Sequence, residues 1–252
     1  MYLEVTTVVP CPVGCLKYCP QEVIAARYKG ERLLSVETFE KCLRNCPKDV
    51  PIYFAGYSEP FCNPEFMSLL NLAESHGHPI ALFTTLVGAS TKDVEQLCEK
   101  KFVAFCLHLP DGEVFKMPQN SEYKDNVFKT ITSISNLNFS IMNDCFVTNR
   151  REEVSRGQKP KPRSFGYCLK IEDPMPVMVP NGDLYLCCMD HGLEAKIGNL
   201  LTEKLEDAIA RIKGSGGFPM CRYCIYNIPL LRRFAQQGKA LIRNVMNWQP
   251  SC

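Results

Sequence analysis

Short apolar runs alternate with amphipathic stretches along the first half of the chain. The apolar runs are rich in β-branched and aromatic residues, which is typical of buried strands, and they lie at residues 2–9, 51–56, 79–84, 102–107 and 138–147. Between them, apolar residues recur every three or four positions, the spacing of one helix face. This alternation of strands and helices indicates an α/β fold built on a parallel sheet or barrel.

Three of the intervening stretches are predicted to be helices. One runs to about residue 46 and another spans about residues 91–99. The third, at residues 64–76, has boundary signals of its own, because Asn63 is suited to cap its start and Gly77 to end it. The cysteines on the apolar faces of these helices are expected to pack in the core; they are Cys42, Cys46 and Cys98.

A smaller C-terminal region is expected after the basic, proline-containing stretch 156–163, which is typical of a linker. Within residues 178–188, an Asn-Gly pair predicts the turn of a β-hairpin. Helices are predicted at about residues 202–213 and 227–247. These features predict two domains and a C-terminal helix with tail, at residues 1–163, 164–226 and 227–252.

The overall composition narrows the class of protein. The chain has 252 residues, of which 46% are hydrophobic, enough for a sizeable core. Its 29 basic and 27 acidic side chains leave a net charge of +2, which favours neither nucleic acid nor a membrane surface as a partner. Apolar runs of membrane-spanning length and the features of a signal peptide are both missing. A cytoplasmic location is therefore expected.

The chain contains 15 cysteines, and three of them lie in the loop CPVGCLKYCP, as Cys11, Cys15 and Cys19. Disulfides are rare in the reducing cytoplasm, so metal binding is the favoured role for such a group. Three thiolates suit a four-iron cluster in which one iron stays open to another ligand. A structural zinc ion would need a fourth protein ligand, and none of the four histidines lies near this loop in the sequence.

The loop resembles that of the radical S-adenosylmethionine (SAM) enzymes, whose usual motif is C-x3-C-x2-C after the first strand. Here the spacing is C-x3-C-x3-C, with one additional residue, while the usual aromatic residue before the third cysteine is present as Tyr18. After the second strand, GYSEP resembles the family's GGEP, with Tyr57 and Ser58 replacing the glycines and Glu59 and Pro60 retained. Similar matches follow at the ends of the third and fourth strands, where a (β/α) barrel gathers its active site. The resemblance implies a partial (β/α)6 TIM-like barrel.

The resemblance also assigns roles to residues of the first two loops. The three loop cysteines would bind the catalytic [4Fe-4S] cluster. Tyr18 would pack against the adenine of SAM, and Ser58 and Glu59 would hold its amino group.

Further cofactor contacts are implied at the next strand ends. Thr84 and Thr85 end the third strand, where the family often has Thr-Asn, and His108 lies near the end of the fourth. These three residues are candidates to contact the methionine and ribose parts of SAM. Arg150 and Arg156 are candidates to bind its carboxylate, although an arginine on the surface is more common.

A second set of cysteines lies in the C-terminal region and comprises Cys168, Cys187, Cys221 and Cys224. It resembles the twitch extension, a shortened SPASM domain that binds an auxiliary [4Fe-4S] cluster and that forms a small β-hairpin/helix iron–sulfur domain. Residues 197–209 are also similar to the sequence between those ligands. On these residues alone, a zinc site with four thiolate ligands is an equal alternative. Beside the first loop, iron–sulfur is favoured.

The implied activity is that of a radical SAM oxidoreductase. The family cleaves SAM reductively to a 5′-deoxyadenosyl radical, which abstracts a hydrogen from the substrate. Four cysteine ligands leave no iron of the second cluster open, which favours electron transfer and hence a net oxidation. The arrangement resembles the aminocyclitol dehydrogenase branch, so we expect dehydrogenation of a small polyol, sugar or aminocyclitol. The expected protein partner is an electron donor such as flavodoxin or ferredoxin.

Two alternatives remain at this stage. The first is radical modification of a peptide, by epimerisation or by formation of a thioether or crosslink. An epimerase needs a thiol that returns a hydrogen, and the unassigned cysteines, for each of which packing is the favoured role, are Cys62, Cys106, Cys145 and Cys188. The second alternative is a non-catalytic iron–sulfur or zinc protein, which would have no need of GYSEP or of Tyr18.

Overall fold

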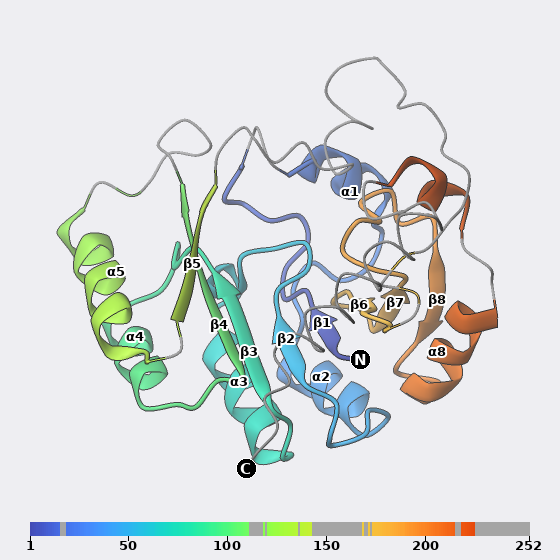
Figure 1. The fold of residues 1–252 in the computed structure, drawn as a ribbon, viewed down its shortest axis with the longest axis horizontal. Helices are drawn as coiled ribbons and strands as arrows, with labels where there is room; N and C mark the ends of the chain where they lie inside the picture. The colour runs from blue at the N-terminus through green and yellow to red at the C-terminus, as the bar shows by residue number, and fades with distance from the viewer. Residues whose placement is uncertain are drawn as a thin grey trace, which may run out of the picture.

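The protein is described by a computed structural model, drawn in Figure 1. The structure describes residues 1–15, 19–110, 118, 120–135, 137–142, 168, 171, 173–214 and 218–224. The predicted linker, the predicted helix at 227–247 and the end of the predicted fifth strand lie outside these residues. In the described part of the chain, no helix is long and apolar enough to cross a membrane.

The described strands form one mixed sheet in the order β5-β4-β3-β2-β1-β6-β7-β8, which can be followed across Figure 1. The first five strands pair in parallel; they are β1 (Leu3–Val5), β2 (Ile52–Phe54), β3 (Ile80–Thr84), β4 (Ala104–Pro110) and β5 (Leu137–Met142). The C-terminal strands continue the sheet on the other side of β1; they are β6 (Val177–Met178), β7 (Asp183–Tyr185) and β8 (Lys196–Asn199). β6 is parallel to β1, and β6, β7 and β8 pair antiparallel in turn. The predicted α/β fold with a partial barrel is confirmed.

The helices of the first half lie in the connections between strands β1 to β5, and the last α-helix follows β8. They are α1 (Gln21–Arg27), α2 (Val36–Leu43), α3 (Phe66–Ser75), α4 (Thr91–Cys98), α5 (Ser121–Ser133) and α8 (Leu205–Gly214). Short 3-10 helices are η1 (Pro60–Cys62) and η2 (Pro219–Tyr223). The pattern of apolar residues predicted α2, α3, α4 and α8, whereas α1 and α5 were not predicted.

The start of α3 differs from the prediction. Glu65, and not Asn63, is the cap residue. The Asn63 side chain is buried and donates to the backbone oxygens of Thr7 and Leu34, at 2.9 Å in both cases. Asn63 therefore ties the segment after β1 to the segment before α2, because its amide satisfies one buried carbonyl group in each. The end of the helix is as predicted, since Gly77 follows it with a φ of +88°.

Alternation along the strands separates a packed face from a face that lines a cavity. Val5, Phe54, Leu82 and Phe105 are neighbours across β1 to β4 and are fully buried. They belong to the core cluster that also contains apolar residues of α2, α3 and α4. Because successive side chains of a strand point to opposite faces, the residues before and after them face the other side of the sheet.

The predicted hairpin joins β6 to β7. Gly182, with a φ of +81°, supplies the left-handed residue that the turn requires. Its N–H donates to the oxygen of Val179 at 2.9 Å, and the Val179 N–H donates to Asp183 at 3.0 Å. The sequence signal at Asn181-Gly182 is thus confirmed.

Candidate active site

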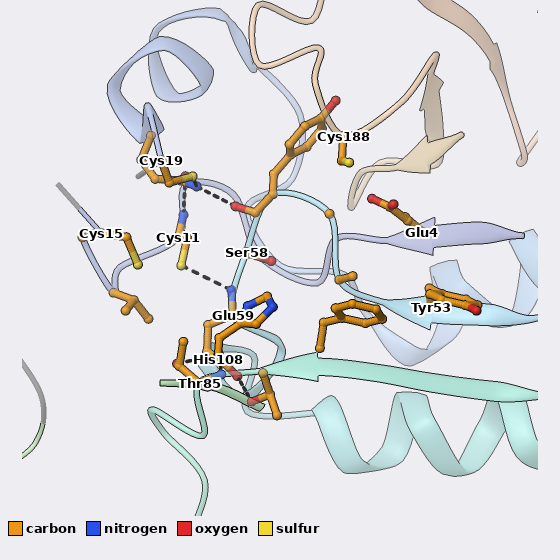
Figure 2. A pocket seen from close by; sticks show the side chains of 18 of the residues that line it. Glu4, Cys11, Cys15, Cys19, Tyr53, Ser58, Glu59, Thr85, His108 and Cys188 are labelled. Carbon is orange, nitrogen blue, oxygen red and sulfur yellow. Dashed lines mark hydrogen bonds between the residues drawn. The ribbon is translucent and has the colours of Figure 1, made fainter. Parts of the chain in front are cut away.

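A cavity of about 300 Å³ lies on the inner face of the sheet, at the carboxyl ends of the parallel strands. Figure 2 shows its lining, which comes from the cysteine loop, from β1 to β4 and from the segment after β7. The predicted site residues that line it are Cys11, Cys15, Cys19, Ser58, Glu59, Thr84, Thr85 and His108. Tyr18, Arg150 and Arg156 lie outside the described residues. The described site residues of the first loop and the next three strand ends therefore share one cavity, while their roles as ligands remain predictions.

Two of the three loop cysteines accept hydrogen bonds at sulfur. The backbone N–H of Glu59 donates to Cys11 Sγ at 3.3 Å, and the Gln21 side-chain amide donates to Cys19 Sγ at 3.1 Å (Figure 2). The His191 ring nitrogen Nε2 lies 3.6 Å from the same Cys19 sulfur. Gly14, with a φ of +66°, bends the loop between the first two cysteines. Donors of this kind favour thiolate sulfur, the form of cysteine that binds metal.

The pKa values of these thiols reflect their crowding. A hydrogen bond with the Cys62 thiol lowers the pKa of Cys11, and the N–H of Glu59 contributes in the same direction. Burial raises the pKa of Cys15 to about 12, with further contributions from the charges of Cys19 and Cys11. The negative charge of one thiolate therefore opposes deprotonation of the next cysteine, unless positive charge between the sulfurs offsets the repulsion. Bound iron supplies such charge, so this donor set fits a metal cluster.

Glu59 joins the end of β2 to the end of β3. Its side chain is buried, and one oxygen accepts from Thr84 Oγ1 at 2.6 Å. The other oxygen accepts from the Thr85 N–H at 2.6 Å and from Thr85 Oγ1 at 2.7 Å. Burial raises the pKa of the Glu59 carboxyl, while these hydrogen bonds act in the opposite direction. The carboxylate is thus held in one orientation at the cavity wall, so that a ligand meets a fixed acceptor.

Comparison with known proteins adds the fold relationship. No protein-family model matches the chain, and no curated protein matches its sequence. Among solved structures, BtrN in complex with AdoMet and 2-DOIA superposes with a TM-score of 0.63 at 14% identity, over 88% of this chain and 87% of that one. The structure of anSMEcpe with bound AdoMet superposes with a TM-score of 0.58 at 13% identity, over 89% of this chain and 86% of that one. The complex of anSMEcpe with AdoMet and the Cp18Cys peptide also superposes with a TM-score of 0.58, at 12% identity, over 90% of this chain and 87% of that one.

The chain has the fold of the radical SAM enzymes. The fold that the cysteine loop and GYSEP implied is thereby confirmed, and the superposition covers 88% of the chain. In this radical SAM fold the cavity lies where a (β/α) barrel gathers its catalytic groups.

The second set of cysteines lies in the C-terminal region. Its members are all buried and are Cys168, Cys187, Cys221 and Cys224. Cys187, Cys221 and Cys224 belong to the main core cluster, and the charge of Cys168 contributes to the raised pKa of Cys221, for which burial is the main cause. Among the residues that the structure describes, no three His, Cys, Asp or Glu side chains surround one point as ligands of a single ion do. A [4Fe-4S] cluster bonds each cysteine to a different iron, so its ligands lie farther apart. The assignment of these four as ligands remains a prediction.

Tyr57, which replaces a glycine of the family motif, connects the two regions. It is buried, and its hydroxyl lies within hydrogen-bond distance of the backbone oxygens of Cys187, at 3.0 Å, and Asp190, at 2.9 Å. The edge of its ring meets His191, with ring centroids 5.0 Å apart. Burial raises its pKa well above the ordinary value. The departure from GGEP thus has a structural reason, since a glycine would leave this contact unmade.

The unassigned thiols fall into different environments. Cys188 lines the cavity, whereas its neighbour Cys187 packs in the core. Cys62 contacts Cys11, and Cys106 lies half-buried on β4. Cys145 lies outside the described residues. Cys42, Cys46 and Cys98 pack in or against the core, as predicted.

Several cavity residues were missed in the sequence. Glu4 is 6% exposed and faces the cavity from β1 (Figure 2). Aromatic rings form a series from the residue before β1 across β2, β3 and β4: Tyr2 stacks on Tyr53 at 3.9 Å between centroids, Tyr53 lies 5.8 Å from Phe83, and Phe83 lies 5.9 Å from His108. The signal that could have found them is the alternation within each strand, because Glu4, Tyr53 and Phe83 each precede or follow a core residue.

Proposed function

We propose that the chain is a radical SAM enzyme that cleaves SAM reductively and abstracts a hydrogen from a substrate. The observation that carries this proposal is the convergence of the three loop cysteines with Ser58, Glu59, Thr84, Thr85 and His108 on one cavity. The arrangement lies in a fold shared with structures that contain AdoMet. A non-catalytic metal protein would have no use for polar groups around an open cavity at its cysteine loop.

The positions of the residues support the roles that the resemblance implies. Cys11, Cys15 and Cys19 would hold a [4Fe-4S] cluster with one iron open to SAM. The cluster and SAM together supply one-electron cleavage and radical hydrogen abstraction, chemistry that no side chain provides. Glu59, fixed by Thr84 and Thr85, would accept hydrogen bonds from the amino group of SAM.

Metal content and SAM cleavage test this proposal. After anaerobic reconstitution, we expect about eight irons and eight sulfides per chain, from two sites of four irons each. With dithionite as reductant, the reconstituted protein should convert SAM to 5′-deoxyadenosine and methionine, and omission of the reductant is the control. A protein that takes up zinc alone, or that holds clusters but never cleaves SAM, would contradict the proposal.

For the reaction itself we propose the net oxidation of a small polyol, sugar or aminocyclitol. Four cysteines in the second set would leave no iron open to substrate, which favours electron transfer there. The BtrN structure, which superposes on this chain, contains the small molecule 2-DOIA. Peptide modification is the second candidate, since Cys188 places a thiol at the cavity wall and anSMEcpe is seen with a bound peptide.

The mass of the product separates these two reactions. Oxidation removes two hydrogens from the substrate, whereas epimerisation leaves the mass unchanged. We also expect that the double variant Cys221→Ala/Cys224→Ala still cleaves SAM but yields no oxidised product, because the electron acceptor is lost. A product of unchanged mass from the unmutated enzyme would rule out oxidation.

A further inference from the structure

Gln21, the first residue of α1, contacts two cysteines of the loop and the segment after β2. Its Oε1 accepts from the backbone N–H of Cys11 at 2.8 Å. Its Nε2 donates to Cys19 Sγ at 3.1 Å and to the backbone oxygen of Tyr57 at 2.5 Å. Nothing in the family motif assigned a role to this residue.

These contacts fix the orientation of the amide. The Cys11 N–H is a donor, so it requires the amide oxygen on its side, and the amide nitrogen must then face Cys19 and Tyr57. The NH₂ group has two hydrogens for these two acceptors. No other natural side chain of similar length combines one acceptor with two donors on a planar head.

The position of Cys19 explains why such a contact matters. The spacing between Cys15 and Cys19 contains one residue more than the usual motif, so the loop alone constrains Cys19 less tightly. Backbone hydrogen bonds hold the main chain, from Cys19 N–H to Cys15 at 2.9 Å and from Gln21 N–H to Cys19 at 3.0 Å. The side chain is then held at sulfur, between the Gln21 amide and the buried ring of His191.

We propose that Gln21 is a positioning residue that sets the distance between Cys11 and Cys19 and raises the reduction potential of the first cluster. The inference rests on the proposed function, because it assumes that these cysteines bind a [4Fe-4S] cluster. Reduction adds negative charge that is shared with the cysteine sulfurs. A donor to one sulfur stabilises the reduced state more than the oxidised state. Loss of the donor therefore makes the potential more negative.

The test is the midpoint potential of each cluster in Gln21→Met and Gln21→Glu, measured by anaerobic redox titration with EPR detection. Met keeps the length of the side chain but has no hydrogen-bond donor. Glu keeps an acceptor for the Cys11 N–H but has no donor for the Cys19 sulfur. At a fixed solution potential, the ratio of reduced to oxidised first cluster should fall about threefold to tenfold in Gln21→Met, the range expected for one hydrogen bond. It should fall further in Gln21→Glu, where a carboxylate faces the sulfur.

Two references separate this effect from a general change in folding. The second cluster of the same molecules should keep its potential, and its signal is assigned with the Cys11→Ala variant. Glu22→Gln changes the next, exposed residue of α1 and should leave both potentials unaltered. Loss of the first cluster alone in Gln21→Met would also support the positioning role.

Other outcomes overturn the inference. Unaltered potentials in both Gln21 variants would show that the contact has no electronic effect, and loss of both clusters would show a role in general folding. In either case the unmutated protein still cleaves SAM, and the proposed function stands. If the unmutated protein forms no first cluster, the proposed function and this inference fail together.

Discussion

Alanine at Cys11, Cys15 or Cys19, one at a time, is expected to reduce the cleavage of SAM to the background of the assay. The three sulfurs line one cavity, and a four-iron cluster with an open iron needs all three of them. The measurement is the formation of 5′-deoxyadenosine by anaerobically reconstituted protein with dithionite. The second cluster should still assemble, because Cys168, Cys187, Cys221 and Cys224 do not line the cavity of the first three cysteines, so about four irons should remain per chain.

The matched control for this experiment is Cys98→Ala. Cys98 packs against the core on α4 and does not line the cavity. This variant should keep both clusters and the unmutated rate of cleavage. Retained cleavage in all three loop variants would show that the cluster has other ligands.

Glu59→Ala is expected to lower the free energy of unfolding by roughly 2 to 4 kcal/mol and to abolish detectable binding of SAM. The substitution leaves the buried Thr84 hydroxyl and the Thr85 N–H and hydroxyl without their acceptor. An unsatisfied buried donor costs about 1 to 3 kcal/mol, and rotation of the threonine side chains recovers part of that cost. Urea denaturation of the protein without clusters measures the first effect, and equilibrium dialysis of SAM on the reconstituted protein measures the second.

Glu65→Ala serves as the comparison for Glu59. Glu65 is exposed, and its side chain makes no capping hydrogen bond at the start of α3. Its replacement should change the free energy of unfolding by less than about 0.5 kcal/mol, as is usual at the surface. If Glu59→Ala unfolds at the same urea concentration as the unmutated protein and still binds SAM, neither role of the carboxylate is correct.

The sequence predicted the elements whose apolar residues follow a regular period. Strands β1 to β4 and helices α2 to α4 all bury one regular face, and the cysteine loop is a local motif. Helix α1 was missed because it is short and buries only Ile24. Helix α5 was missed because it buries Tyr123, Asn126 and Thr130, while Phe128 is 70% exposed. The spacing of its apolar residues therefore does not show which face of the helix is buried.

The contacts that complete the candidate site have no local signal. Cys19 and His191 are 172 positions apart, and Tyr57 and Cys187 are 130 apart. Tyr57 was recognised only as a departure from GGEP, and Asn63 was assigned to a helix cap although its amide serves two distant carbonyl groups. Such pairings depend on how the strands are arranged in space, which the order of residues does not specify by itself.

Strand β1 has hydrogen-bonded neighbours on both sides, β2 from the barrel and β6 from the C-terminal region. The cysteine-containing C-terminal region therefore differs from a module that proteins gain or lose independently. Its deletion would leave β1 with an unpaired edge, a common starting point for aggregation, and would remove Leu184 and Ile197 from the core cluster shared with α2 and α3. The barrel and its C-terminal extension share one sheet and one core, so we expect them to unfold together and expect gene truncations or domain exchanges at their junction to be rare among descendants of this chain.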